Sequence, residues 1–166
     1  MRLEPMTLPS AEEVVILDYS PEHHDAFRNL NLAWIEEYFS VEAADREQHD
    51  DPESSLLADG GAILVAQQGQ QTVGVGALRY ESPGCFEVTK MAVDSTLRYG
   101  GVGRKVLLAL LDRARALEAE EVFLICNTSL APAIHLYRSV GFSEIPLRGA
   151  KQYDRGNIAF GLQLDS

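Results

Sequence analysis

The chain has 166 residues, of which 46% are hydrophobic and 23% are charged, and its formal net charge at neutral pH is −11. This length and composition predict one soluble globular domain with a core of its own. The acidic balance argues against general nucleic-acid binding, which requires a basic face that displaces counterions from phosphates.

The amino-terminal end has no apolar stretch of the kind found in a signal peptide. We expect residues 1–12 to form a flexible leader before a single domain at residues 13–166. No apolar run is long enough to cross a membrane. Cys85 and Cys126 form neither a CxxC pair nor a metal-spaced set, which predicts two buried, reduced thiols in a cytoplasmic protein. The histidines likewise indicate no metal site.

The first half of the chain predicts a short strand, two helices and part of a β-sheet. A strand at residues 14–17 precedes a helix that Ser20 can cap and that continues to about Phe39. A second, shorter helix begins after a cap at Ser40 and ends before Pro52. Three antiparallel strands are expected next, at residues 62–67, 72–80 and 85–93.

The second half begins with a loop at residues 94–100 that opens a long amphipathic helix. A strand and a further helix follow, and Gly141 is placed to end that helix in a left-handed conformation. The strand is expected at residues 121–126 and the helix at residues 131–140. Two closing strands are expected at residues 142–145 and 158–164. This order predicts an α/β (α+β) fold with a mixed, mostly antiparallel sheet of about six to seven strands, flanked by about four helices.

A glycine-rich turn joins the strand at 85–93 to the long helix. Its glycines are Gly100, Gly101 and Gly103, and its flanking bases are Arg98, Arg104 and Lys105. The glycines leave backbone amides uncovered, and the helix N-terminus adds partial positive charge. The turn therefore predicts a site for a diphosphate.

Two other phosphate loops fit the turn less well. A Walker A loop needs Gly-Lys-Ser/Thr, which is absent here. A dinucleotide fingerprint needs a third glycine where the chain has Val106, and it begins directly at the end of the strand. A nicotinamide-dependent oxidoreductase stays open as an alternative.

The turn resembles the acyl-CoA loop of the GNAT superfamily of N-acetyltransferases. Arg98-x-x-Gly101-x-Gly103 is similar to its Gln/Arg-x-x-Gly-x-Gly/Ala motif, and residues 133–142 are similar to its Ala-x-x-Leu-Tyr-x-x-x-Gly-Phe segment. Many members carry Asn where this chain has Leu130, and Asn127 is the candidate to replace it. The resemblance extends over residues 14–164 and implies the GNAT fold.

The resemblance also implies that acetyl-CoA is the cosubstrate, and the residues themselves predict no metal. It implies contacts with acetyl-CoA at Met91, Ala92, Val93, Arg98, Tyr99, Gly100, Gly101, Val102, Gly103, Arg104, Asn127, Ala133 and Tyr137.

Acetyl transfer to an amine requires a base, an oxyanion donor and an acid. An alkylamine with a pKa near 10 is neutral only about once in a thousand molecules at pH 7, so a carboxylate that accepts its proton is useful. Glu87 is our candidate for this base, and the alternative is that Glu87 is a surface glutamate or is ion-paired with Lys90 or Arg79. Tyr137 is the candidate acid for the coenzyme A thiolate, and the alternative is a core aromatic. Backbone N–H groups near residues 91–93 are expected to stabilise the oxyanion.

The acceptor is expected to be a small-molecule or peptide amine of undecided identity. Trp34 and Tyr38 could form an apolar wall for it. Its ammonium group could be attracted by Glu36, Glu37 or Asp45. At helical spacing the two aromatic residues could equally be core. Because homodimers are common in the superfamily, a homodimer is possible here. The alternative function is a module that binds acyl-CoA as a sensor and catalyses no reaction.

Overall fold

The computed structural model describes residues 13–39, 51–97, 101–147 and 156–164. Seven strands form one sheet: β1 (Val14–Asp18), β2 (Ala62–Gln68), β3 (Gln71–Ser82), β4 (Cys85–Val93), β5 (Glu121–Cys126), β6 (Ser143–Ile145) and β7 (Ile158–Gln163). Their order across the sheet is β1-β2-β3-β4-β5-β7-β6. Among these neighbours β4 and β5 are the parallel pair and the others are antiparallel. The predicted mixed, mostly antiparallel sheet is confirmed.

The longer helices are α1 (His24–Tyr38), α3 (Val102–Ala116) and α4 (Ala131–Val140), and shorter helical turns are η2 (Pro21–His23), η3 (Glu53–Leu57) and η4 (Ser95–Leu97). The three longer helices lie close to the predicted positions. The expected end of helical structure before Pro52 is wrong, because Pro52 is the N-cap of η3, a position where its missing N–H costs no helix hydrogen bond. The turn η4 lies within the expected loop at residues 94–100. The expected leader at residues 1–12 and most of the expected second helix, at residues 40–50, lie outside the described residues.

Ser20 is a cap and Gly141 ends α4, as predicted, but Ser20 caps the short turn η2 that leads into α1, and α1 itself begins at His24. Ser20 forms a capping box with His23, in which the Ser20 backbone N–H donates to His23 Nδ1 at 3.0 Å. His23 therefore has a capping role, which also accounts for its burial. Gly141 ends α4 with φ of 116°, a conformation that only glycine adopts readily.

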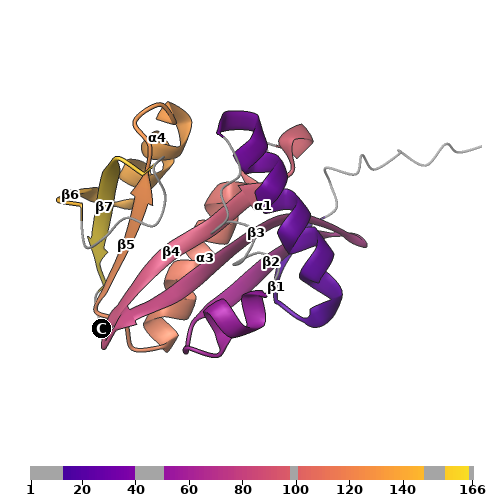
Figure 1. Ribbon diagram of the computed structural model, residues 1–166, viewed down its shortest axis with the longest axis horizontal. Coiled ribbons are helices and arrows are strands. Elements are labelled where there is room, and N and C mark those ends of the chain that lie inside the picture. The colour runs from indigo at the N-terminus through magenta and orange to yellow at the C-terminus, as the bar shows by residue number, and fades with distance from the viewer. Residues whose placement is uncertain (1–12, 40–50, 98–100, 148–155, 165–166) are drawn as a thin grey trace, which may run out of the picture.

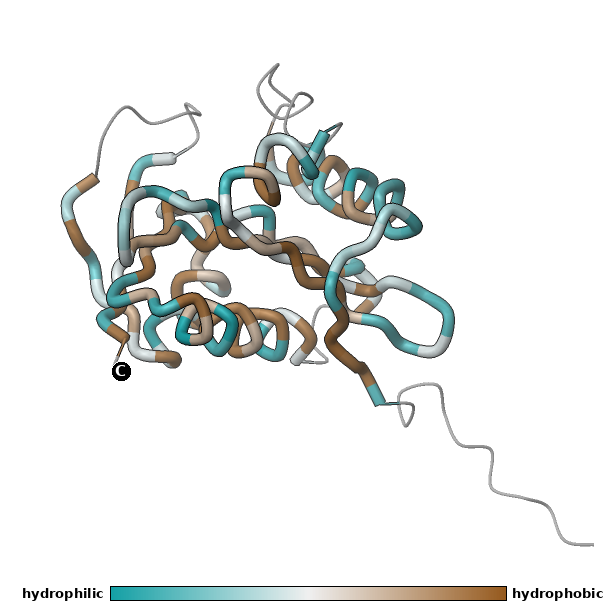
Figure 2. Tube along the Cα trace, turned by 90° about the horizontal axis from the view of Figure 1, so that it is seen from below, coloured by the Kyte–Doolittle hydropathy of each residue, from teal (hydrophilic) through white to brown (hydrophobic). Residues whose placement is uncertain are grey.

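The sheet lies between helices on both of its faces (Figures 1 and 2). Phe27 of α1 packs with Ile63 and Val65 of β2 on one face. On the other face, the apolar stripe of α3 packs with the larger part of the core, which includes Leu124 and Phe160. Figure 2 shows the hydrophobic strands running between the two helical layers. Burial of both strand faces explains their nearly continuous apolar sequence.

Both cysteines are buried and neither is in a disulfide, as predicted. No helix in the described part of the chain combines the length and the hydrophobicity needed to span a membrane.

Candidate active site

The strands β4 and β5 separate after a short stretch of pairing. They pair in parallel from Cys85–Glu121 to Glu87–Phe123. Beyond Glu87, β4 and β5 diverge toward α1 and α4 (Figure 1). Backbone groups on the facing edges are available to a ligand, because strand pairing does not use them there.

A β-bulge changes the direction of β4 in this unpaired stretch. Opposite Gly76 of β3, β4 has two residues, Lys90 and Met91. Lys90 has φ of 57°, a left-handed conformation that is costly for a residue with a side chain. Val88 and Met91 pack on the same side of the sheet although they are three positions apart, which a regular strand does not allow. The bulge therefore shifts the alternation of β4 by one residue.

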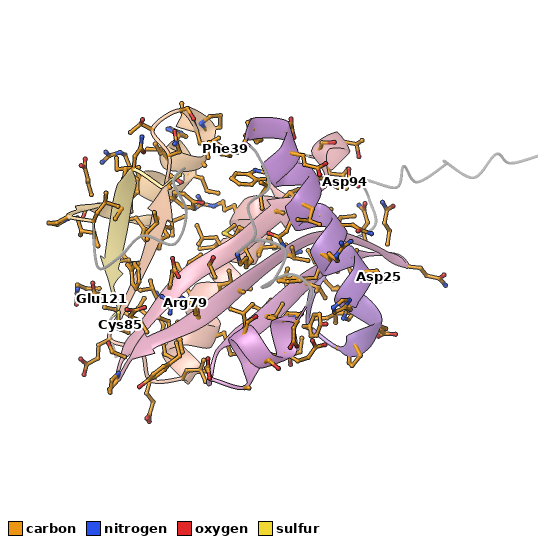
Figure 3. All side chains as sticks on the ribbon, viewed as in Figure 1. Asp25, Phe39, Arg79, Cys85, Asp94 and Glu121 are labelled. Carbon is orange, nitrogen blue, oxygen red and sulfur yellow. The ribbon has the colours of Figure 1, made fainter. Side chains whose placement is uncertain are left out.

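A cavity of about 140 Å³ occupies the opening between the two strands. Both helical layers line it, since α1 contributes Asn31, Trp34 and Ile35 and α4 contributes Ala133 and Tyr137. Figure 3 labels Phe39, another lining residue, at the end of α1. The cavity therefore connects the α1 side of the sheet with the α4 side. The strands and the β5–α4 connection add Glu87, Val88, Thr89, Lys90, Met91, Leu124, Ile125, Cys126, Asn127 and Leu130.

Glu87 lines this cavity and forms an ion pair with Arg79. Its Oε1 atom accepts a hydrogen bond from Arg79 Nε at 2.7 Å, and 14% of its side chain is exposed. Arg79 also pairs with Glu81. Glu87 is therefore ion-paired, as the alternative interpretation expects, and it also lines the cavity. The ion pair and the position in the cavity are compatible.

Tyr137 lines the same cavity from α4. Its ring lies against Phe142 and Phe160, with centroids 6.0 and 6.3 Å away. Burial, and secondarily the nearby Cys126 thiol, raises the pKa of the Tyr137 phenol well above its usual range. No described residue forms a hydrogen bond with its hydroxyl group. The phenol is therefore protonated at neutral pH and has a proton to donate.

The first turn of α3 is open among the described residues. Gly101 is the N-cap with φ of 77°, and no side chain caps the helix. A Cβ atom on Gly101 would meet nothing within 4 Å, and one on Gly103 would meet Val93 and Leu136 only at ordinary contact distances. The structure therefore leaves room for an anion at this helix N-terminus. The loop residues Arg98, Tyr99 and Gly100 lie outside the described residues.

The two other predicted bases have partners of their own. Arg104 Nη1 donates to Ser139 Oγ on α4 at 3.1 Å. Lys105 Nζ donates to the backbone carbonyl of Val14 on β1. Arg104 therefore lies between α3 and α4, next to the glycine turn. Lys105, expected to add positive charge to the turn, contacts β1 instead.

The remaining predicted contacts lie around the cavity. Asn127 lines it, and its Oδ1 atom accepts the Ser129 backbone N–H at 2.9 Å, which shapes the turn into α4. Trp34 also lines it and packs against Tyr38, with ring centroids 5.5 Å apart. Glu37 and Tyr38 are exposed and are not among the described lining residues.

The lining residues that the sequence does not predict as site residues include Asn31, Lys90 and Cys126. Asn31 had a signal, because it is a polar residue four positions from both Phe27 and Ile35 on the buried stripe of α1. Lys90 had one as well, since it follows Thr89 and breaks the polar–apolar alternation of the strand. Cys126 had none.

Comparisons with known proteins agree with the fold and with the positions of both motifs. The model of the acetyltransferase (GNAT) family matches residues 24–142. N-alpha-acetyltransferase RimI of Mycobacterium tuberculosis is 36% identical over 133 residues, which cover 80% of this chain and 76% of that protein. IAA acetyltransferase of Azospirillum brasilense is 37% identical over 83 residues, which cover 49% of this chain and 54% of that protein, so the match spans about half of that relative.

Among solved structures, an acetyltransferase of the GNAT family from Staphylococcus aureus has the same fold. Its TM-score is 0.83 at 20% identity, and the match covers 92% of this chain and all of that one. The family match extends over more than half of the chain and includes both the glycine turn and the Tyr137 segment. The chain belongs to the acetyltransferase (GNAT) family.

Proposed function

We propose that this protein transfers the acetyl group of acetyl-CoA to a primary amine by direct attack. The proposal rests on one observation above all: a single cavity brings Glu87 of β4 and Tyr137 of α4 to the opening between β4 and β5. The acceptor amine enters from the α1 side, and the acetyl-CoA arm enters from the α4 side. Membership of the acetyltransferase family supports this reaction over the dinucleotide alternative.

The described residues fit acetyl-CoA as a cosubstrate. The open first turn of α3 offers backbone N–H groups and a partial positive charge to the diphosphate. Ala133 lines the cavity with a small side chain, which leaves space for the pantetheine arm. That arm can pair with the β4 edge near residues 91–93, since β5 has already separated from β4. Arg98, Tyr99, Gly100, Val102 and Arg104 complete the proposed diphosphate contacts, and Asn127 is the proposed polar contact for the arm.

Glu87 and Tyr137 have opposite proton-transfer roles in this proposal. The acceptor nitrogen attacks the thioester carbonyl carbon, and Glu87 accepts the nitrogen-bound proton directly or through a water molecule. The carbon–sulfur bond then breaks, and the departing thiolate takes the Tyr137 hydroxyl proton. Backbone N–H groups of β4 next to the bulge stabilise the oxyanion. Arg79 holds the Glu87 carboxylate in position through their hydrogen bond.

A non-catalytic acyl-CoA sensor is the second candidate function. Such a sensor needs the open α3 turn but needs neither a carboxylate nor a phenol in the cavity. The presence of both Glu87 and Tyr137 there favours the enzyme. Among the relatives, the protein named N-alpha-acetyltransferase supports a peptide amine as acceptor, and both a peptide and a small-molecule amine are candidates.

The test is a screen of amines with acetyl-CoA that measures free thiol and the mass of the product. We expect at least one amine to gain one acetyl group with release of one thiol, and Tyr137→Phe to slow this turnover while acetyl-CoA still binds. Tight binding of acetyl-CoA without acetylation of any amine in a broad panel would support the sensor instead.

A further inference from the structure

Asn31 is a buried polar residue whose side-chain oxygen has no partner among the residues that the structure describes. It is 3% exposed and lies on α1 between the buried residues Phe27 and Ile35. Its Nδ2 atom donates to the Phe27 carbonyl at 3.0 Å. That carbonyl is also the usual acceptor for the Asn31 backbone N–H within the helix, so the helix does not depend on the side-chain bond. No described residue donates to Oδ1, and buried acceptors without a donor are rare in folded proteins.

Asn31 lines the cavity on the side from which the acceptor would enter. Its neighbours along α1 in the lining are apolar, namely Trp34, Ile35 and Phe39. A donor N–H that comes with the acceptor would satisfy Oδ1 and would be shielded from water by these side chains. Asn31 can therefore distinguish acceptors that have such an N–H from acceptors that lack it.

The charges around the cavity favour a neutral N–H over a second ammonium group. Among the described lining residues, Glu87 and Lys90 are the charged ones. Glu87 is the carboxylate among these residues and is already paired with Arg79, so the described lining has no further carboxylate for a second ammonium group. A second ammonium next to a neutral amide oxygen would lose its hydration without a counter-charge. A polyamine therefore fits this cavity less well than an amide.

We propose that Asn31 Oδ1 accepts a hydrogen bond from the first backbone amide N–H of a peptide acceptor, whose α-amine is the group acetylated. The inference rests on the proposed acetyl transfer and adds the class of acceptor to it. Asn31 is a specificity-determining residue in this arrangement, and it takes no part in proton transfer.

The experiment compares matched acceptors with matched variants. A set of tripeptide amides, Xaa-Ala-Ala with each N-terminal residue, is screened with acetyl-CoA beside spermidine and propylamine. The best peptide is then remade with an ester oxygen in place of its first amide N–H. Asn31→Leu removes the acceptor oxygen, and Asn31→Ala serves as a second variant if leucine disturbs folding. Asn29→Leu is the control, because Asn29 is an exposed asparagine on the same helix.

In the parent protein, we expect the ester to lower kcat/KM about 10-fold relative to the amide. In Asn31→Leu, the peptide should fall to about the level of its ester, and the ester should lose little further. Asn29→Leu should behave as the parent. Calorimetry with acetyl-CoA and thermal melting of each variant separate recognition of the acceptor from binding of the cosubstrate and from folding.

The possible outcomes distinguish failure of the Asn31 role from failure of the proposed acetyl transfer. An unchanged amide-to-ester ratio in the folded Asn31 variants, or faster acetylation of spermidine than of every peptide, would overturn the role of Asn31 and leave acetyl transfer intact. If no amine is acetylated although acetyl-CoA binds, the proposed function fails and this inference fails with it.

Discussion

Arg79 and Glu87 face each other across the β3–β4 pair, with the arginine Nε 2.7 Å from the carboxylate Oε1. The ion pair places a fixed carboxylate at the edge of the cavity, and Figure 3 labels its partner Arg79. Glu81 pairs with the same arginine but does not line the cavity. Variants of these three residues can therefore separate the orientation of the Glu87 carboxylate from its role in proton transfer.

The first prediction concerns this pair. Glu87→Gln should lower kcat by about 10²- to 10⁴-fold, the usual range for loss of a general base. Arg79→Met should lower kcat by about 10- to 100-fold, because the carboxylate loses its orientation. The double variant should be no slower than Glu87→Gln alone, since both changes act through the same group. Steady-state kinetics of the four proteins complete the cycle.

Glu81→Gln is the control and should keep nearly the parental kcat. Acetyl-CoA affinity, measured by calorimetry, should be unchanged in all these variants. Additive losses in the double variant would show that Arg79 does not act through Glu87.

The second prediction concerns Tyr137 and pH. Because burial raises the pKa of the Tyr137 phenol above the usual value of about 10, the phenol stays protonated across the neutral and mildly alkaline range. The kcat of the parent should therefore show no alkaline decrease from this group below about pH 10. Tyr137→Phe should lower kcat by about 10²- to 10⁴-fold without weakening acetyl-CoA binding. A decrease below pH 9 that is present in the parent and absent in the variant would contradict the assignment.

The same pKa shift affects stability with a defined sign. The folded state holds the Tyr137 proton more tightly than the unfolded state does, so this contribution to stability is complete below about pH 10 and declines as pH rises further. Thermal melting of parent and Tyr137→Phe between pH 8 and pH 11 should therefore show a steeper alkaline loss in the parent. Parallel curves would show that the phenol ionises as freely in the folded state as in the unfolded one.

The third prediction concerns the open turn of α3. Gly103→Asp places a carboxylate at the helix N-terminus, which should raise stability by about 0.3–1 kcal/mol and weaken acetyl-CoA binding about 10-fold by repelling the diphosphate. Gly103→Ala is the matched control, since its Cβ would meet only ordinary contacts. It should keep the parental affinity. Equal affinities of the two variants for acetyl-CoA would place the diphosphate elsewhere.

The fourth prediction uses the two buried thiols. Burial raises the pKa of the Cys126 thiol, so its reaction with iodoacetamide at pH 7.5 should be slower than that of a free cysteine. Because Cys126 lines the cavity and Cys85 does not, acetyl-CoA should slow alkylation of Cys126 and leave Cys85 unchanged. Mass spectrometry of peptides after timed labelling measures both sites in one sample. Equal protection of the two thiols would indicate general stabilisation of the fold instead of occupation of the cavity.

The amino-acid sequence alone determined the elements of this protein and the family to which it belongs. Strand alternation, the Ser20 cap and Gly141 each depend on neighbouring residues, so they could be read locally and are confirmed by the structure. The glycine turn and the Tyr137 segment have specific spacings, and the family match includes both. The sequence also predicts Glu87 and Tyr137 as site residues, and both line one cavity in the structure.

Only the tertiary structure decided how these parts meet. The Lys90 bulge depends on the register of β3 against β4, and the cavity depends on where β4 and β5 stop pairing. Both are relations between distant segments, which no local pattern encodes. For the same reason, the contact of Lys105 with β1 depends on how the helices pack on the sheet, as does the buried Asn31 oxygen, to which no described residue donates.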